Sequence, residues 1–113
     1  PTVIEGLNNK SKLNQEEIFG PLVTLQTFKS EEDAIEIAND TGFGLSATIW
    51  TKCNEKSRRV AKKIDAGVIW INCWMVRDLR TPFGGLKNSG LGREGGKSIF
   101  RFFTEQKNIC EIR

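Results

Sequence analysis

The chain has 113 residues, 27% of them charged, and a net charge of +3, which fits one domain that buries roughly two-thirds of its unfolded surface. Acidic and basic residues are interleaved and no apolar run approaches the roughly 20 residues that cross a bilayer, so we expect a cytoplasmic protein without nucleic-acid or membrane partners. The three cysteines are widely spaced and histidine is absent, which excludes a disulfide framework, the usual zinc sites and Ser–His or Cys–His nucleophile pairs.

Residues 22–28 (LVTLQTF) follow a Gly-Pro breaker and are rich in β-forming side chains, so they predict a strand. Ser30 with Asp33 resembles a capping box with the shorter acid, which predicts the start of a helix. Residues 45–51 (LSATIWT) predict a second strand that is apolar on both faces, as a strand covered on both sides requires. The helix between these strands has an apolar stripe that is expected to be buried, namely Ala34, Ile35, Ile37 and Ala38.

A second helix is predicted from a cap at Asn54 to Gly67, because glycine suits the position just after a helix end. Residues 68–72 (VIWIN) predict a third strand. Alternating strands and helices at this short spacing imply right-handed crossovers and parallel pairing. The sequence therefore predicts an α/β fold, a parallel-sheet layer with helices on both faces. The side chains that the second helix is expected to bury are Val60, Ala61 and Ile64.

The rest of the chain predicts a long loop over residues 73–92, a short helix near 95–103 and a terminal strand at 108–112. Loops of roughly 20 residues inside a compact domain are uncommon and usually carry function. In α/β sheets, loops that leave the carboxyl ends of strands line the ligand crevice. This loop is therefore the best candidate for a functional site.

The loop ends in a G-x-G-x-x-G pattern that starts at Gly90 and matches the letters of a dinucleotide-binding fingerprint. That fingerprint requires a strand that runs into the first glycine and an acidic ribose ligand roughly 20 residues later. Neither is present, so we expect these glycines to serve backbone geometry rather than phosphate binding.

Four motifs in one order resemble the C-terminal part of the NAD(P)-dependent aldehyde dehydrogenases: QEEIFGP, GLSATIWT, VIWIN and PFGGLKNSGLGRE. The resemblance implies that residues 1–106 are the C-terminal part of a catalytic domain and that residues 107–113 form an oligomerisation strand. It also implies NAD as the cofactor, a small aldehyde as the substrate and a homo-oligomer, dimer or tetramer, as the assembly.

The family's nucleophile lies in a G-Q-x-C motif and its general base in an E-L-G-G motif, and this chain has neither. The chain opens at Pro1 and has its only methionine at Met75. We therefore expect a fragment with no catalytic residue of its own, inactive alone. In the family, the complete enzyme holds the aldehyde as a thiohemiacetal, transfers hydride to NAD and hydrolyses the thioester to an acid.

By the same resemblance, Glu17 matches a position that holds the nicotinamide ribose, or it is a polar loop residue. Phe19 matches a position that packs beside the nicotinamide, or it is a core anchor. Phe83 matches a position that lines the aldehyde tunnel, or it is a packed loop aromatic. Glu94 matches a glutamate that relays protons toward the general base, or it pairs with Arg93.

Residues 73–85 (CWMVRDLRTPFGG) resemble the branch of the family that oxidises 2-hydroxymuconic or 2-aminomuconic semialdehyde, substrates that carry a carboxylate. Arg77 matches an arginine that grips this carboxylate, and a planar guanidinium binds a carboxylate through two hydrogen bonds. Arg80 is the competing candidate, and either arginine could instead pair with Asp78. Cys73 is expected to be structural. The alternatives are a dehydrogenase for another aldehyde class, or a non-enzymatic α/β module that binds a partner through the terminal strand.

Overall fold

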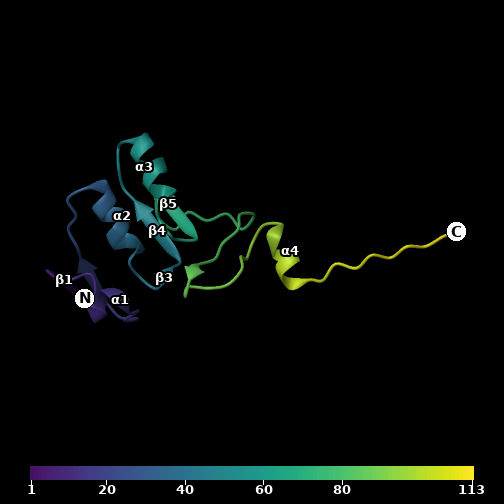
Figure 1. The fold of residues 1–113 in the computed structure, drawn as a ribbon, viewed down its shortest axis with the longest axis horizontal. Helices are drawn as coiled ribbons and strands as arrows, with labels where there is room; N and C mark the ends of the chain where they lie inside the picture. Colours follow the sequence, from purple (N-terminus) through teal and green to yellow (C-terminus); the bar gives the residue numbers. More distant parts are fainter.

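The structure is a computed structural model that describes all of residues 1–113 (Figure 1). Short strands and helices alternate along the first 71 residues, as an α/β fold requires, and a loop region and a last helix follow. The elements are β1 (Thr2–Glu5), α1 (Lys12–Gln15), β2 (Leu22–Leu25), α2 (Glu31–Asn39), β3 (Phe43–Gly44), β4 (Ser46–Ile49), α3 (Asn54–Ala61), β5 (Val68–Ile71), β6 (Leu86–Lys87) and α4 (Ser98–Phe103).

The centre of the fold is the β4–α3–β5 unit, whose two strands pair in parallel from Ser46 opposite Val68 to Ile49 opposite Ile71. This pairing confirms the parallel crossover predicted from the sequence. On one face of the pair, the side chains of β4 line a groove together with residues of α2 and α3, which lie side by side over the strands (Figure 1). On the other face, Trp70 donates a hydrogen bond of 2.8 Å to the carbonyl of Val76 in the following loop. Within this chain, helices thus cover one face and the loop covers the other.

The strand β2 does not join the β4–β5 pair, which corrects the prediction of one layer of three strands. It pairs in parallel with β1, a strand at the chain start that the sequence analysis did not predict. A third pair, β3 with β6, is antiparallel. It ties the glycine-rich loop, residues 84–96, to the segment before β4. The alternation of apolar residues identifies a strand but not its neighbour, and this is why the pairing was missed.

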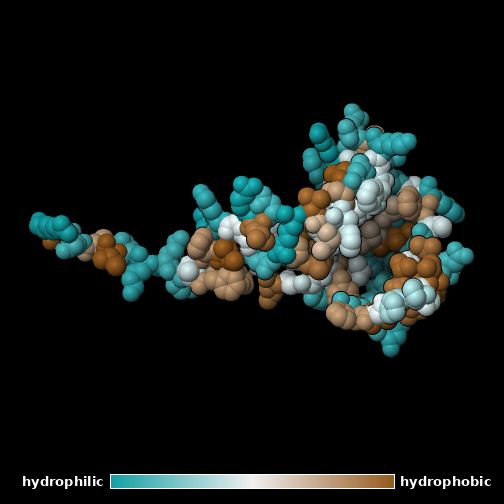
Figure 2. All heavy atoms as spheres, turned by 180° about the vertical axis from the view of Figure 1, so that it is seen from behind, coloured by the Kyte–Doolittle hydropathy of each residue, from teal (hydrophilic) through white to brown (hydrophobic).

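Few side chains are buried, which corrects the expectation of a closed core. The accessible surface is 9525 Å², whereas a compact protein of this mass exposes roughly 6,200 Å². Among the large apolar side chains, Trp70 is the one that is buried. The predicted stripe of α2 is half-buried at three positions and exposed at Ala38. Figure 2 shows apolar side chains around a hollow on the body of the molecule and along the extended end of the chain.

The start of α2 forms as predicted. The Ser30 hydroxyl accepts a hydrogen bond of 3.1 Å from the Asp33 amide, and the Asp33 carboxylate accepts one of 2.9 Å from the Lys29 amide. Helix α3 differs from its prediction at both ends. Cys53 rather than Asn54 precedes the first helical residue, and the helix ends at Ala61, before Gly67.

Arg59 of α3 is tied to Glu31 in the first turn of α2 by two hydrogen bonds of 2.7 Å each. These bonds hold the pKa of the Glu31 carboxyl below its ordinary value. We expect Arg59→Ala to return this pKa toward the ordinary range, as measured by an NMR titration of the carboxyl carbon. The pair stabilises the fold above the ordinary pKa of glutamate, and the stabilisation is lost as the pH falls through the lowered value.

Arg58→Ala is the matched control for this prediction, because Arg58 is exposed on the same helix and makes no ion pair. An unchanged titration of Glu31 in Arg59→Ala would contradict the role given to the pair.

Residues 104–113 form neither helix nor strand and extend away from the body (Figure 1). The strand expected at residues 108–112 stays a prediction, because its expected neighbour is another subunit. None of the helices α1 to α4 has the length and apolar character that spanning a lipid bilayer requires.

Candidate functional site

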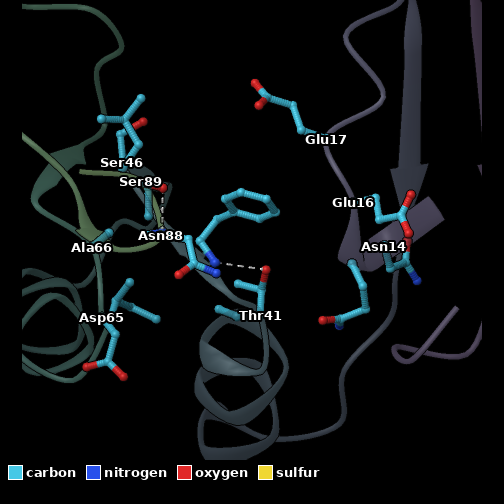
Figure 3. A pocket seen from close by; sticks show the side chains of 16 residues that line it. Asn14, Glu16, Glu17, Thr41, Ser46, Asp65, Ala66, Asn88 and Ser89 are labelled. Atoms are coloured by element: carbon cyan, nitrogen blue, oxygen red, sulfur yellow. Dashed lines mark hydrogen bonds between the residues drawn. The ribbon is translucent and has the colours of Figure 1, made fainter. Parts of the chain in front are cut away.

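A groove of about 520 Å³ lies between the segment after α1 and the turns around β3 and β6. Glu17 stands on one side of it, and Asp65 and Ser89 stand on the other (Figure 3). The Ser89 hydroxyl accepts a hydrogen bond of 2.9 Å from the Gly44 amide, which fixes the far wall to the end of β3. The groove is therefore polar on both sides, with the carboxylates of Glu16 and Glu17 on the near side and that of Asp65 on the far side.

The structure places Glu17 beside Phe19, as the motif predicts. Both residues line a second hollow of about 350 Å³ next to the groove. The backbone of Phe19 is left-handed, with φ of 54°, and the residue is 91% exposed. A bulky residue in this conformation is unusual and costs free energy, and such positions cluster at ligand sites. The ring is thus turned outward, so the core-anchor alternative for Phe19 is not what the structure shows.

The carboxyl ends of β4 and β5 are fastened together where the candidate loop begins. The Asn72 side chain donates to the Thr51 carbonyl and accepts from the Thr51 amide, both at 2.8 Å. Asn72 itself has a left-handed backbone, with φ of 53°, which turns the chain out of the strand into the loop. Cys73 follows as a free, half-buried thiol.

Backbone hydrogen bonds join the two ends of the segment from Phe83 to Glu94 and so close it into a loop. Phe83 and Glu94 exchange two hydrogen bonds of 2.7 Å each between their amides and carbonyls. The Arg93 guanidinium donates to the carbonyls of Gly85 and Gly92 at 2.9 and 2.6 Å. Arg93 is thus engaged by the backbone of the loop, and the alternative pairing of Glu94 with Arg93 does not occur.

The glycines of the loop serve backbone geometry, as expected. Gly95 has φ of 74°, and a Cβ atom there would lie 2.4 Å from the carbonyl oxygen of Thr81. The Gly96 amide donates to the Leu79 carbonyl at 3.2 Å. The glycine conformations and this hydrogen bond hold the folded path of the loop, as the sequence predicted.

Three of the predicted site residues meet on this loop. The Arg77 guanidinium carbon lies 4.5 Å above the centre of the Phe83 ring. Arg77 Nη2 also donates a hydrogen bond of 2.5 Å to Glu94 Oε1. Phe83 and Glu94 line a groove of about 350 Å³ between the loop and α4. The structure brings Arg77, Phe83 and Glu94 together, and it places Glu17 and Phe19 at the separate groove after α1.

Arg80 is engaged elsewhere, which separates the two arginine candidates. Its guanidinium donates three hydrogen bonds of 2.6 to 3.1 Å to Asp78, two residues away. This contact lowers the pKa of the Asp78 carboxyl and raises the pKa of the Arg80 guanidinium. Asp78 therefore pairs with Arg80, and Arg77 keeps the stacked position over Phe83.

Most residues that line the groove were not predicted from the sequence, among them Asn88 and Ser89. The polar run before Gly90 suggested only an exposed loop. The available signal was the Ser-Gly turn, because a serine in a turn often accepts a backbone hydrogen bond.

The comparisons with known proteins identify the family of the chain. The sequence matches the model of the aldehyde dehydrogenase family over residues 1–109. The chain belongs to the aldehyde dehydrogenase family. The resemblance seen in the four motifs is confirmed, and so is the α/β fold class.

Similar aldehyde dehydrogenases include the 2-aminomuconic semialdehyde dehydrogenase of Danio rerio, 52% identical over 96% of this chain, and the 2-hydroxymuconic semialdehyde dehydrogenase of Pseudomonas putida, 52% identical over 97%. The structure of the P. syringae indole-3-acetaldehyde dehydrogenase AldA in complex with NAD+ and IAA matches 93% of this chain with a TM-score of 0.88 and 43% identity. The chain spans 22%, 23% and 21% of these three proteins.

Proposed function

We propose that this chain is the C-terminal part of an NAD-dependent aldehyde dehydrogenase that oxidises a carboxylated, muconic-type semialdehyde to the acid. The observation that carries the proposal is the Arg77 guanidinium, stacked on Phe83 in the loop that leaves the carboxyl end of β5. Such a guanidinium can bind the substrate's carboxylate in a planar fork. The names of the similar muconic semialdehyde dehydrogenases support the same substrate class.

The residues after α1 fit a nicotinamide cofactor. The Glu17 carboxylate is exposed on the groove wall and can accept hydrogen bonds from the two hydroxyls of a ribose. The exposed ring of Phe19, in the adjoining hollow, can pack against a flat heterocycle and exclude water from it. When bound, NAD accepts the hydride in such a reaction. The complexes of similar aldehyde dehydrogenases with NAD+ support this assignment.

The chemical step is proposed to use groups outside these 113 residues, namely a cysteine that forms a thiohemiacetal and a glutamate base. Residues of this chain would bind the substrate and the cofactor, and Glu94 would assist proton transfer. Further polypeptide of the same enzyme would cover the apolar surface that the chain leaves open. Residues 107–113 would pair with a neighbouring subunit, because this segment extends away from the body with Ile109 and Ile112 81% and 101% exposed.

The test is turnover by the complete enzyme, followed by NADH formation. A carboxylated semialdehyde should give a kcat/KM at least about tenfold above that of an uncharged aldehyde of the same length, since a hydrogen bond to a charged group contributes about 1.5–3 kcal/mol. The 113-residue chain alone should reduce no NAD. Equal kcat/KM values for the two aldehydes would contradict the substrate class. Turnover by the chain alone would contradict the proposal that the reacting cysteine and the base lie outside these 113 residues.

A further inference from the structure

The Arg77 guanidinium, proposed to bind the substrate's carboxylate, already pairs with a carboxylate of this chain, that of Glu94. Arg77 Nη2 donates to Glu94 Oε1, and this is a single contact between exposed side chains, 47% and 55% accessible. The remaining N–H groups of Arg77 have no acceptor in the structure. The arginine is thus occupied by one carboxylate oxygen and retains free donors.

We propose that Glu94 is a specificity-determining residue that competes with the substrate's carboxylate for Arg77. The inference rests on the proposed function, since it takes Arg77 as the group that binds a carboxylated semialdehyde. Its own content concerns Glu94, which acts as an internal anion that the substrate displaces.

The position of Arg77 does not depend on Glu94. The Phe83 ring lies 4.5 Å beneath the guanidinium and attracts it as a cation over an aromatic face. Phe83 is fixed in turn by its two backbone hydrogen bonds to Glu94, which a change of the Glu94 side chain leaves intact. Removal of the carboxylate therefore frees the donors of Arg77 while the guanidinium keeps its place.

The displacement is favourable for a substrate that binds through two oxygens. A bidentate carboxylate makes two charge-assisted hydrogen bonds where Glu94 makes one. An exposed ion pair is weak, so Glu94 yields at a modest cost in affinity. An uncharged aldehyde cannot displace Glu94 and gains nothing from Arg77. The competition thus discriminates among anions: it favours a carboxylate that uses both arms of the guanidinium over an anion that makes one hydrogen bond, and it leaves uncharged aldehydes unaffected.

The experiment measures the binding of adipate, a six-carbon dicarboxylate, to the complete enzyme by calorimetry. Glu94→Gln should bind adipate about two- to fivefold more tightly than the wild type, the range expected for loss of an exposed ion pair. Glu36→Gln removes an equal charge from an exposed position of α2 and should leave adipate affinity unchanged. In turnover, Glu94→Gln should lower the ratio of the KM for the carboxylated semialdehyde to the KM for the uncharged aldehyde by the same factor, since an effect on proton transfer is common to both substrates.

Three results would overturn the inference: unchanged or weaker adipate binding in Glu94→Gln, no adipate binding to either protein, or a KM that moves equally for both aldehydes. The last would mark Glu94 as a purely structural residue. The proposed function fails separately, through absent NAD reduction by the wild type with a carboxylated semialdehyde. A fall in kcat in Glu94→Gln concerns the proton-transfer role and leaves the affinity comparison intact.

Discussion

Arg77→Ala should raise the KM of the complete enzyme for a carboxylated semialdehyde by about 10- to 100-fold, the range for a lost hydrogen bond to a charged group. The substitution removes the forked donors that the structure holds over Phe83. An uncharged aldehyde does not use these donors, so its KM should stay within about twofold. Initial rates of NADH formation across a range of concentrations of each aldehyde measure both values.

Arg80→Ala is the matched control for this substitution, because Arg80 lies on the same loop and its guanidinium is engaged by Asp78. It should change neither KM by more than about twofold. An equal rise of KM for both aldehydes in Arg77→Ala would remove Arg77 from the substrate role.

Loss of Arg77 also leaves the Glu94 carboxylate without its partner, and this free charge should repel an anionic substrate. The double variant with Glu94→Gln should therefore bind the carboxylated semialdehyde better than Arg77→Ala alone. A cycle of the two single variants and the double variant separates the loss of attraction from the added repulsion.

Local patterns were sufficient for the elements whose signals lie close together in the sequence. The Ser30 cap with Asp33 and the β4–α3–β5 crossover form as predicted, since capping and short crossovers depend on neighbouring residues. The pairing of β2 with β1 could not be predicted, because both partners are short strands and nothing in their composition specifies a neighbour. The family was recognisable because four motifs occur in one order.

The candidate site was only partly predictable for a similar reason. Motif resemblance selected Arg77, Phe83 and Glu94 one at a time, but their meeting depends on a loop closed by backbone hydrogen bonds between residues 83 and 94. That closure requires left-handed glycines at positions that the sequence marks only as flexible. The ion pair between Arg77 and Glu94 is a consequence of this backbone path.

Gly67→Ala should destabilise the complete enzyme by at least about 2 kcal/mol, because it forces bulk into a closed contact. The sequence analysis explained this glycine as the residue just after a helix end. The structure gives a different reason, since α3 ends at Ala61 and Gly67 lies against the glycine-rich loop. A Cβ atom at Gly67 would lie 1.7 Å from the Gly84 carbonyl oxygen and 2.8 Å from its carbon. These neighbours are backbone atoms, so no side chain can rotate away to make room.

The loop must therefore move, and its movement should reach the site because Gly84 directly follows Phe83. Thermal unfolding should show a lowered midpoint, and any protein that remains folded should show a raised KM for the carboxylated semialdehyde. Gly20→Ala is the control, since a Cβ there meets no atom closer than 3.9 Å. An unchanged midpoint in Gly67→Ala would mean that β5 and the glycine-rich loop are not held at this distance, and the placement of Phe83 beneath Arg77 would lose its support.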